Sequence, residues 1–297
     1  MTGALLASGC TTSQTTNPHV HMPTRHLEAR GPLWDRLSSL SFDRPESRFH
    51  SADFFKPNAD ETRGVAPELA PLIVQQISKA VSQVDHGARF GALHVVGRDW
   101  WVDADRPTVY FDSSTAVLQA KPYRQLVFSW VYAKTACNFG SQGVRMTLDA
   151  EGFPFIWEVA HGFGGVKHIY IARSLEEAAA DQFGPPLPGR RYSIEAGLSQ
   201  CPDAVVARVL DDGPIPMGPF VYLDDHCNTV RTLICRCMPA QVDEFVHTVY
   251  YDLVPVEETH GFESVGLGAR SLTVAALIKW RIDSGWLERC LRLPKLN

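Results

Sequence analysis

The chain has 297 residues, a formal net charge of -5, 45% hydrophobic residues and 21% charged residues. This length and composition are those of a globular protein whose core needs no metal or disulfide to fold. No block of about five or more Lys and Arg residues is present, which argues against nucleic acid as a partner. No run of about eighteen apolar residues is present either, so no segment reads as a membrane-spanning helix.

The N-terminal stretch MTGALLASGCTTSQTTNPHV places small residues directly before Cys10 and a Thr-, Ser- and Asn-rich segment after it. This order resembles a bacterial lipoprotein signal, in which the cysteine becomes the lipidated first residue. The resemblance implies a lipid anchor on Cys10, a membrane as partner, and a location in the bacterial cell envelope. The alternative is a disordered tail with an incidental cysteine, which leaves the protein cytoplasmic. We predict a signal-like segment and flexible linker over residues 1–33 and one globular domain over 34–297.

Apolar periodicity predicts three helices along this domain. Residues 66–84 repeat apolar side chains every three or four positions and begin with a proline in the first turn. Residues 174–184 form a short helix with Ser174 as its N-cap and Gly184 as its C-cap. A long C-terminal helix is expected over residues 270–293, weakened at Gly285.

Short segments rich in β-branched and aromatic residues, separated by turn residues, predict strands between these helices. They cover residues 92–97, 100–104, 108–112, 124–133, 144–150, 204–210, 219–224, 230–237 and 244–254, with further strand pieces and two turns over 149–172. Strands in runs favour an α+β fold. We expect a largely antiparallel sheet packed by an N-terminal-side helix and a C-terminal helix.

The chain has seven cysteines, and Cys235 and Cys237 stand two residues apart at the end of a predicted strand. On a regular strand, Leu233, Cys235 and Cys237 share one face, and the two cysteines are roughly 7 Å apart, too far for an easy mutual disulfide. Cys227 and His226 lie in a polar turn just upstream, and a hairpin would bring Cys227 near Cys235. Three interpretations stay open: core or free thiols, disulfides among the cysteines after Cys10, and a metal or redox site.

His161 and His168 flank a Gly-rich turn, so a hairpin would bring the two imidazoles close together. With the thiolates of Cys235 and Cys237 they make a sound ligand set for zinc or copper. Glu158 or Asp225 would then serve as a nearby acid or base. The spacing matches no zinc signature, and ordinary strand-end histidines are the alternative.

Aromatic residues complete the expected core. Trp100, Trp101 and Trp130 are predicted to fill it rather than to line a ligand cleft.

Residues 106–172 are similar to a family of uncharacterised bacterial envelope lipoproteins. The shared order is Pro-x-Val-Tyr, a Gln-Leu strand, an Arg-x-Thr-Leu-Asp-x-x-Gly-x-Pro turn, and a His before a short loop that ends in His. The matching positions are Pro107, Val109, Tyr110, Gln125, Leu126, Arg145, Thr147, Leu148, Asp149, Gly152, Pro154, His161 and His168. The family's loop carries cysteines, where this chain has Gly164 and Gly165. The resemblance implies an envelope location and no particular activity.

The sequence therefore predicts an envelope lipoprotein with a binding or structural role rather than a catalytic one. The alternative is a metal- or thiol-dependent enzyme, or a metal-binding protein, that uses the His and Cys residues named above.

Overall fold

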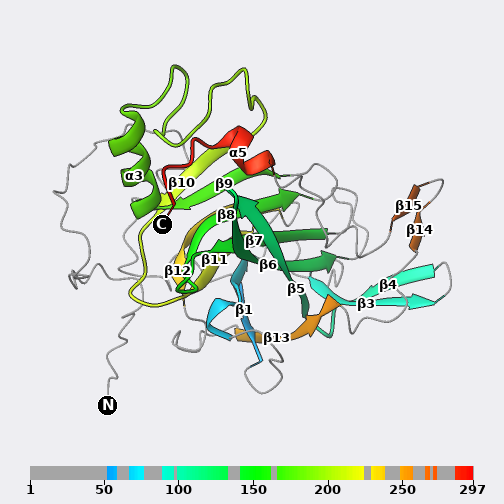
Figure 1. Ribbon diagram of the computed structural model, residues 1–297. Coiled ribbons are helices and arrows are strands. Elements are labelled where there is room, and N and C mark those ends of the chain that lie inside the picture. The colour runs from blue at the N-terminus through cyan, green and yellow to red at the C-terminus, as the bar shows by residue number, and fades with distance from the viewer. Residues whose placement is uncertain are drawn as a thin grey trace, which may run out of the picture.

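The computed structural model describes residues 52–58, 67–76, 89–96, 99–132, 141–161, 166–223, 229–237, 248–256, 265–267, 270–272 and 285–296. Within these ranges the chain is mostly strand (Figure 1). The helical elements described are the 3₁₀ turn η2 (Pro67–Leu69), α3 (Arg173–Phe183) and α5 (Trp286–Cys290). None of the helices in these ranges is long and apolar enough to cross a membrane.

The main sheet contains 13 strands in the order β10-β9-β8-β7-β6-β5-β13-β1-β2-β11-β12, with the hairpin β3–β4 attached to β6. Their bounds are β1 (Ala52–Pro57), β2 (Leu72–Gln76), β3 (Phe90–Val96), β4 (Asp99–Asp103), β5 (Thr108–Leu118), β6 (Lys121–Tyr132), β7 (Ser141–Leu148), β8 (Pro154–His161), β9 (Val166–Ala172), β10 (Val205–Leu210), β11 (Gly218–Leu223), β12 (Val230–Cys237) and β13 (Thr248–Pro255). A separate hairpin pairs β14 (Val265–Leu267) with β15 (Arg270–Leu272). The strands predicted between residues 92 and 254 are thus confirmed, with shifted ends.

The sheet is mixed and curls until its two ends approach each other. Strand β13 runs parallel to both of its neighbours, β1 and β5, and the pairs β2–β11 and β9–β10 are also parallel. Tyr170 of β9 shares a side-chain hydrogen bond with Thr232 of β12. Arg208 of β10 donates to the backbone carbonyl of Leu233 of β12 at 3.4 Å. The expectation of a largely antiparallel α+β fold packed by two helices is therefore wrong: this is a mostly-β protein with a nearly closed sheet.

Within the described residues, neither of the two long helices that the periodicity predicted is present as a long helix. Residues 72–76 form β2, whose side chains are buried from Leu72 to Gln75 because the strand lies between β1 and β11. A strand buried on both faces reads as a continuous apolar run, which periodicity cannot separate from a helix. Residues 270–272 form β15, and among the described residues of the predicted C-terminal helix those that are helical are 286–290. Residues 77–88 and 273–284 lie outside the described residues.

The short helix α3 is confirmed, but its N-terminus differs from the predicted one. The N-cap position is Ala172, whose side chain makes no capping hydrogen bond. Asp212 supplies the cap instead, since its carboxylate accepts from the backbone N–H and the hydroxyl of Ser174, both at 2.9 Å. A carboxylate at a helix N-terminus also complements the helix dipole. Gly184, at a φ of 76°, ends the helix as predicted.

Candidate functional site

The structure describes only some of the residues predicted to form a site. Cys10, Asp225, His226 and Cys227 lie outside the described residues, as do the side chains of His161, Cys235 and Cys237. In backbone register, His161 lies opposite Gln142, and His168 lies opposite Val159.

The backbone places Cys235 and Cys237 far along β12 from the end of that strand that lies near His161. The side chain of Gln142, directly opposite His161, accepts a hydrogen bond from the N–H of Val230 at 2.8 Å. Val230 is the first residue of β12, and Cys235 and Cys237 come five and seven residues later. At the rise of a strand these positions are roughly 17 and 23 Å beyond Val230. Within the described residues no group of three His, Cys, Asp or Glu side chains could hold a metal ion. The zinc or copper site stays a prediction.

Glu158, the predicted acid or base, is engaged in an ion pair. It stands opposite Arg145 in the β7–β8 register. The guanidinium donates two hydrogen bonds of 2.6 Å to its two carboxylate oxygens, and both residues are buried. A bidentate pair of this kind satisfies both charges within the sheet. In this structure Glu158 is therefore a partner of Arg145 rather than a group facing solvent.

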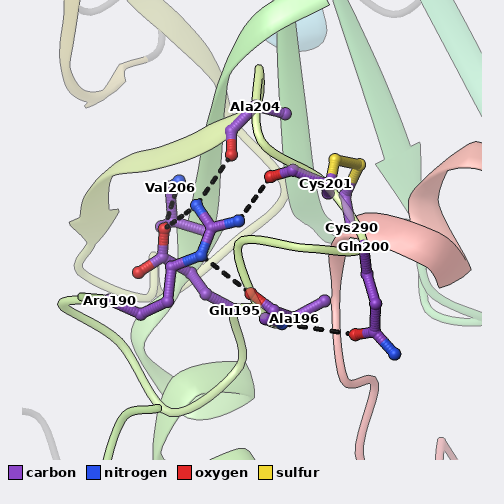
Figure 2. The surroundings of a disulfide bond; sticks show 9 residues. Arg190, Glu195, Ala196, Gln200, Cys201, Ala204, Val206 and Cys290 are labelled. Carbon is purple, nitrogen blue, oxygen red and sulfur yellow. Dashed lines mark hydrogen bonds and ion pairs between the residues drawn. A yellow bond between two sulfur atoms is a disulfide. The ribbon is translucent and has the colours of Figure 1, made fainter. Parts of the chain in front are cut away.

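A disulfide between Cys201 and Cys290 ties the C-terminal segment to the loop before β10 (Figure 2). The two cysteines are 89 residues apart in sequence. The backbone N–H of Ala196 donates to the carbonyl of Cys290 at 2.9 Å, which reinforces the same junction. The disulfide interpretation therefore holds for this pair of cysteines, a pairing that the sequence did not specify.

The loop that carries Cys201 is organised by one arginine (Figure 2). Arg190 donates to the carbonyl oxygens of Ala196 at 2.8 Å and Ala204 at 3.0 Å, and also to that of Cys201. Its side chain is buried beside that of Glu195, at 3.7 Å. Buried carbonyl groups have few other hydrogen-bond donors within reach, so Arg190 holds the loop in one conformation.

The C-terminal segment also holds the turn between β5 and β6. Gln119 and Ala120 occupy this two-residue turn at φ values of 50° and 62°. The N–H of Gln119 donates to Glu288 at 2.5 Å, and its side-chain amide donates to the carbonyl oxygens of Leu293 and Pro294, both at 2.9 Å. A left-handed turn without glycine is thus stabilised by contacts from a distant segment.

A surface cleft of about 480 Å³ opens beside this turn. It is lined by Lys121, Pro122, Tyr123, Arg124, Leu148, Asp149, Ala150 and Gly152. Burial raises the pKa of Asp149, and the hydrogen bond that it accepts from the N–H of Phe153 partly opposes this increase. Burial, together with the charge of Asp149, raises the pKa of Tyr123. Lys121 already donates to the carbonyl of Leu296 at 2.7 Å. The lining therefore mixes both charges and favours no single class of ligand.

The hairpin β3–β4 presents an aromatic pair to solvent, contrary to the expected core position of Trp101. Trp101 is 50% exposed and lies stacked on His94, with ring centroids 5.2 Å apart and planes 12° apart. Trp130, by contrast, is fully buried as predicted. Side chains alternate between the two faces of a strand, so adjacent residues of β4 such as Trp100 and Trp101 cannot both face the core. This signal was present in the sequence, but the adjacent pair of large apolar residues suggested a core position for both.

No family model, curated protein or solved structure matches the chain.

Proposed function

We propose that the chain is a cell-envelope protein, anchored to a membrane through a lipid on Cys10, that acts in binding or as a structural component rather than as an enzyme. The observation that carries the location is the disulfide between Cys201 and Cys290. Disulfides form and persist in oxidising compartments such as the bacterial periplasm and are rare in the cytosol. The lipoprotein-like order of residues before Cys10 supports the same compartment independently.

Several carboxylates away from solvent are held by partners within the fold, which supports a structural role. Glu158 is held by Arg145, and Glu195 lies beside Arg190 while accepting from the N–H of Val206 at 3.0 Å. The half-buried Glu176 accepts from the backbone N–H groups of residues 193–194, and its partial burial raises its pKa. Each of these carboxylates has a structural partner that accounts for its position.

The test uses cells that express the full chain from its own gene, fractionated after their free thiols are blocked by alkylation. We expect wild-type protein in the membrane fraction, with Cys201 and Cys290 protected from alkylation until a reductant is added. The Cys10→Ala variant should move to the soluble fraction and keep the disulfide. A soluble wild-type protein in which Cys201 and Cys290 are alkylated without reductant would instead show a cytosolic protein and overturn the proposal.

A further inference from the structure

The exposed face of the hairpin β3–β4 carries two aromatic rings and a carboxylate. His94 and Trp101 are directly opposite each other in the register. Asp103 follows Trp101 by two residues and therefore shares its face of the strand. One carboxylate oxygen of Asp103 lies 3.8 Å from Nε2 of His94. We call His94, Trp101 and Asp103 the hairpin platform.

Trp101 is held by His94 and still presents much of its surface to solvent. A stacked ring covers one face of the indole, and the residue remains 50% exposed with His94 in place. Among the tryptophans whose exposure the structure gives, Trp130 and Trp157 are fully buried. Exposed tryptophan side chains held in a fixed orientation are characteristic of interaction sites, because they offer a large contact area at little entropic cost.

Among the described residues, the charged groups next to Trp101 are mainly carboxylates. Asp103 accepts from the N–H of Asp105 at 3.1 Å, which brings a second acidic residue beside it. Arg106, the basic residue of this turn, is directed to Asp252, with 3.4 Å between nitrogen and oxygen. A negative rim around an indole favours a cationic group, by charge and by attraction to the π face. It disfavours phosphate groups of nucleic acids or anionic lipids.

We propose that the hairpin platform binds a basic segment of a protein partner. A Lys or Arg side chain contacts the exposed part of the Trp101 indole, with its charge attracted by the carboxylate of Asp103. His94 holds the indole from the other side. The hairpin projects from the side of the main sheet, with β14 next to β4 (Figure 1). The inference rests on the proposed binding role but requires neither the lipid anchor nor the envelope location.

The test follows Trp101 directly in purified, oxidised protein labelled with 5-fluorotryptophan. Its ¹⁹F signal is assigned by its loss in Trp101→Phe. The probe is a blocked peptide with three Arg-Gly repeats, and the matching Glu-Gly peptide is the charge control. We expect the Arg-Gly peptide to shift the Trp101 signal saturably. Isothermal titration calorimetry with the same peptide measures the affinity of the variants, and Trp101→Ala and Asp103→Asn should each weaken binding about fivefold or more.

Two control variants separate the platform from general attraction to an acidic protein. Glu177→Gln removes one negative charge from an exposed position on α3, and Val117→Ala trims another apolar residue that is 50% exposed. Both should bind the Arg-Gly peptide like wild type. An unmoved Trp101 signal, equal binding of the Glu-Gly peptide, or equal loss in Glu177→Gln would overturn the proposal. None of these results would change the fractionation result, so the two proposals fail separately.

Discussion

The guanidinium carbon of Arg236 lies 4.7 Å from the centre of the Trp157 ring. This contact joins β12 to β8, two strands that do not pair with each other. Arg236 is buried, and burial lowers its pKa against the opposing effect of Asp212, Asp149 and Asp211. Asp212, at 3.3 Å, also caps α3. One buried cation therefore links the closing edge of the sheet to the start of a helix.

Replacing Arg236 tests whether its charge or its packing matters. Arg236→Ala should lower the free energy of unfolding by about 2–4 kcal/mol, because it leaves a cavity beside Trp157 and removes the cation. Arg236→Met fills the same space without charge, and we expect a loss of about 1 kcal/mol or less, since a buried ion pair often contributes little net stability. Urea unfolding of both variants provides the comparison. Equal losses in the two variants would show that the charge itself holds the sheet closed.

The face of β12 that carries Arg236 could not be predicted from the sequence. Simple alternation places Leu233 and Arg236 on opposite faces of β12. In the structure Val221 pairs with Leu233 and Pro219 with Arg236, so Phe220 alone stands opposite two residues of β12. This bulge returns Arg236 to the face of Leu233. An extra residue in a strand leaves no clear mark in the sequence, and any face assigned beyond it is reversed.

The strands were predictable and their assembly was not. Segments such as residues 230–237 carry β-branched residues between turn signals, and β12 has those bounds. The parallel placement of β13 between β1 and β5 depends on pairings between residues far apart in the sequence, such as Phe54 with Thr248 and Thr108 with Asp252, which local patterns do not encode. The same holds for the disulfide, because spacing alone does not specify which cysteines pair.

The disulfide should contribute a large part of the stability. We expect the double variant Cys201→Ser and Cys290→Ser to lose about 2–5 kcal/mol in free energy of unfolding, since the bond closes a long loop in the unfolded chain. Guanidinium unfolding with and without dithiothreitol measures this loss. Dithiothreitol should destabilise the wild type to the level of the double variant and leave that variant unchanged. A further effect of the reductant on the double variant would contradict the assignment of the stabilisation to this bond.

The turn between β5 and β6 holds Ala120 at a φ of 62°, which glycine adopts without strain. We expect Ala120→Gly to raise the free energy of unfolding by about 1 kcal/mol. The matched control is Ala116→Gly in the neighbouring strand β5, where the side chain is buried and glycine should cost about 1 kcal/mol. Thermal unfolding of both variants shows whether each substitution stabilises or destabilises the protein. Destabilisation at both positions would mean that the backbone at Ala120 is not strained.

Asp149 should make stability depend on pH in the direction opposite to that of a salt-bridged carboxylate. Burial is the largest cause of its raised pKa, and the negative charge of Glu151 raises it further against the backbone N–H bonds it accepts. The folded state therefore binds the proton more tightly than the unfolded state, whose pKa is near the ordinary 3.8. The stability that protonation provides is lost as the pH rises from about that value through the folded-state pKa.

The Asp149→Asn variant isolates this effect. Asparagine can still accept the hydrogen bond that the carboxylate accepts from the N–H of Phe153 at 2.7 Å, but it cannot ionise. The difference in free energy of unfolding, variant minus wild type, should increase as the pH rises from about 3.8 and then level off once wild-type Asp149 is ionised in both states. Urea unfolding at a series of pH values measures this difference. A decrease over the same range would show that the N–H groups around Asp149 stabilise its charge more than burial penalises it.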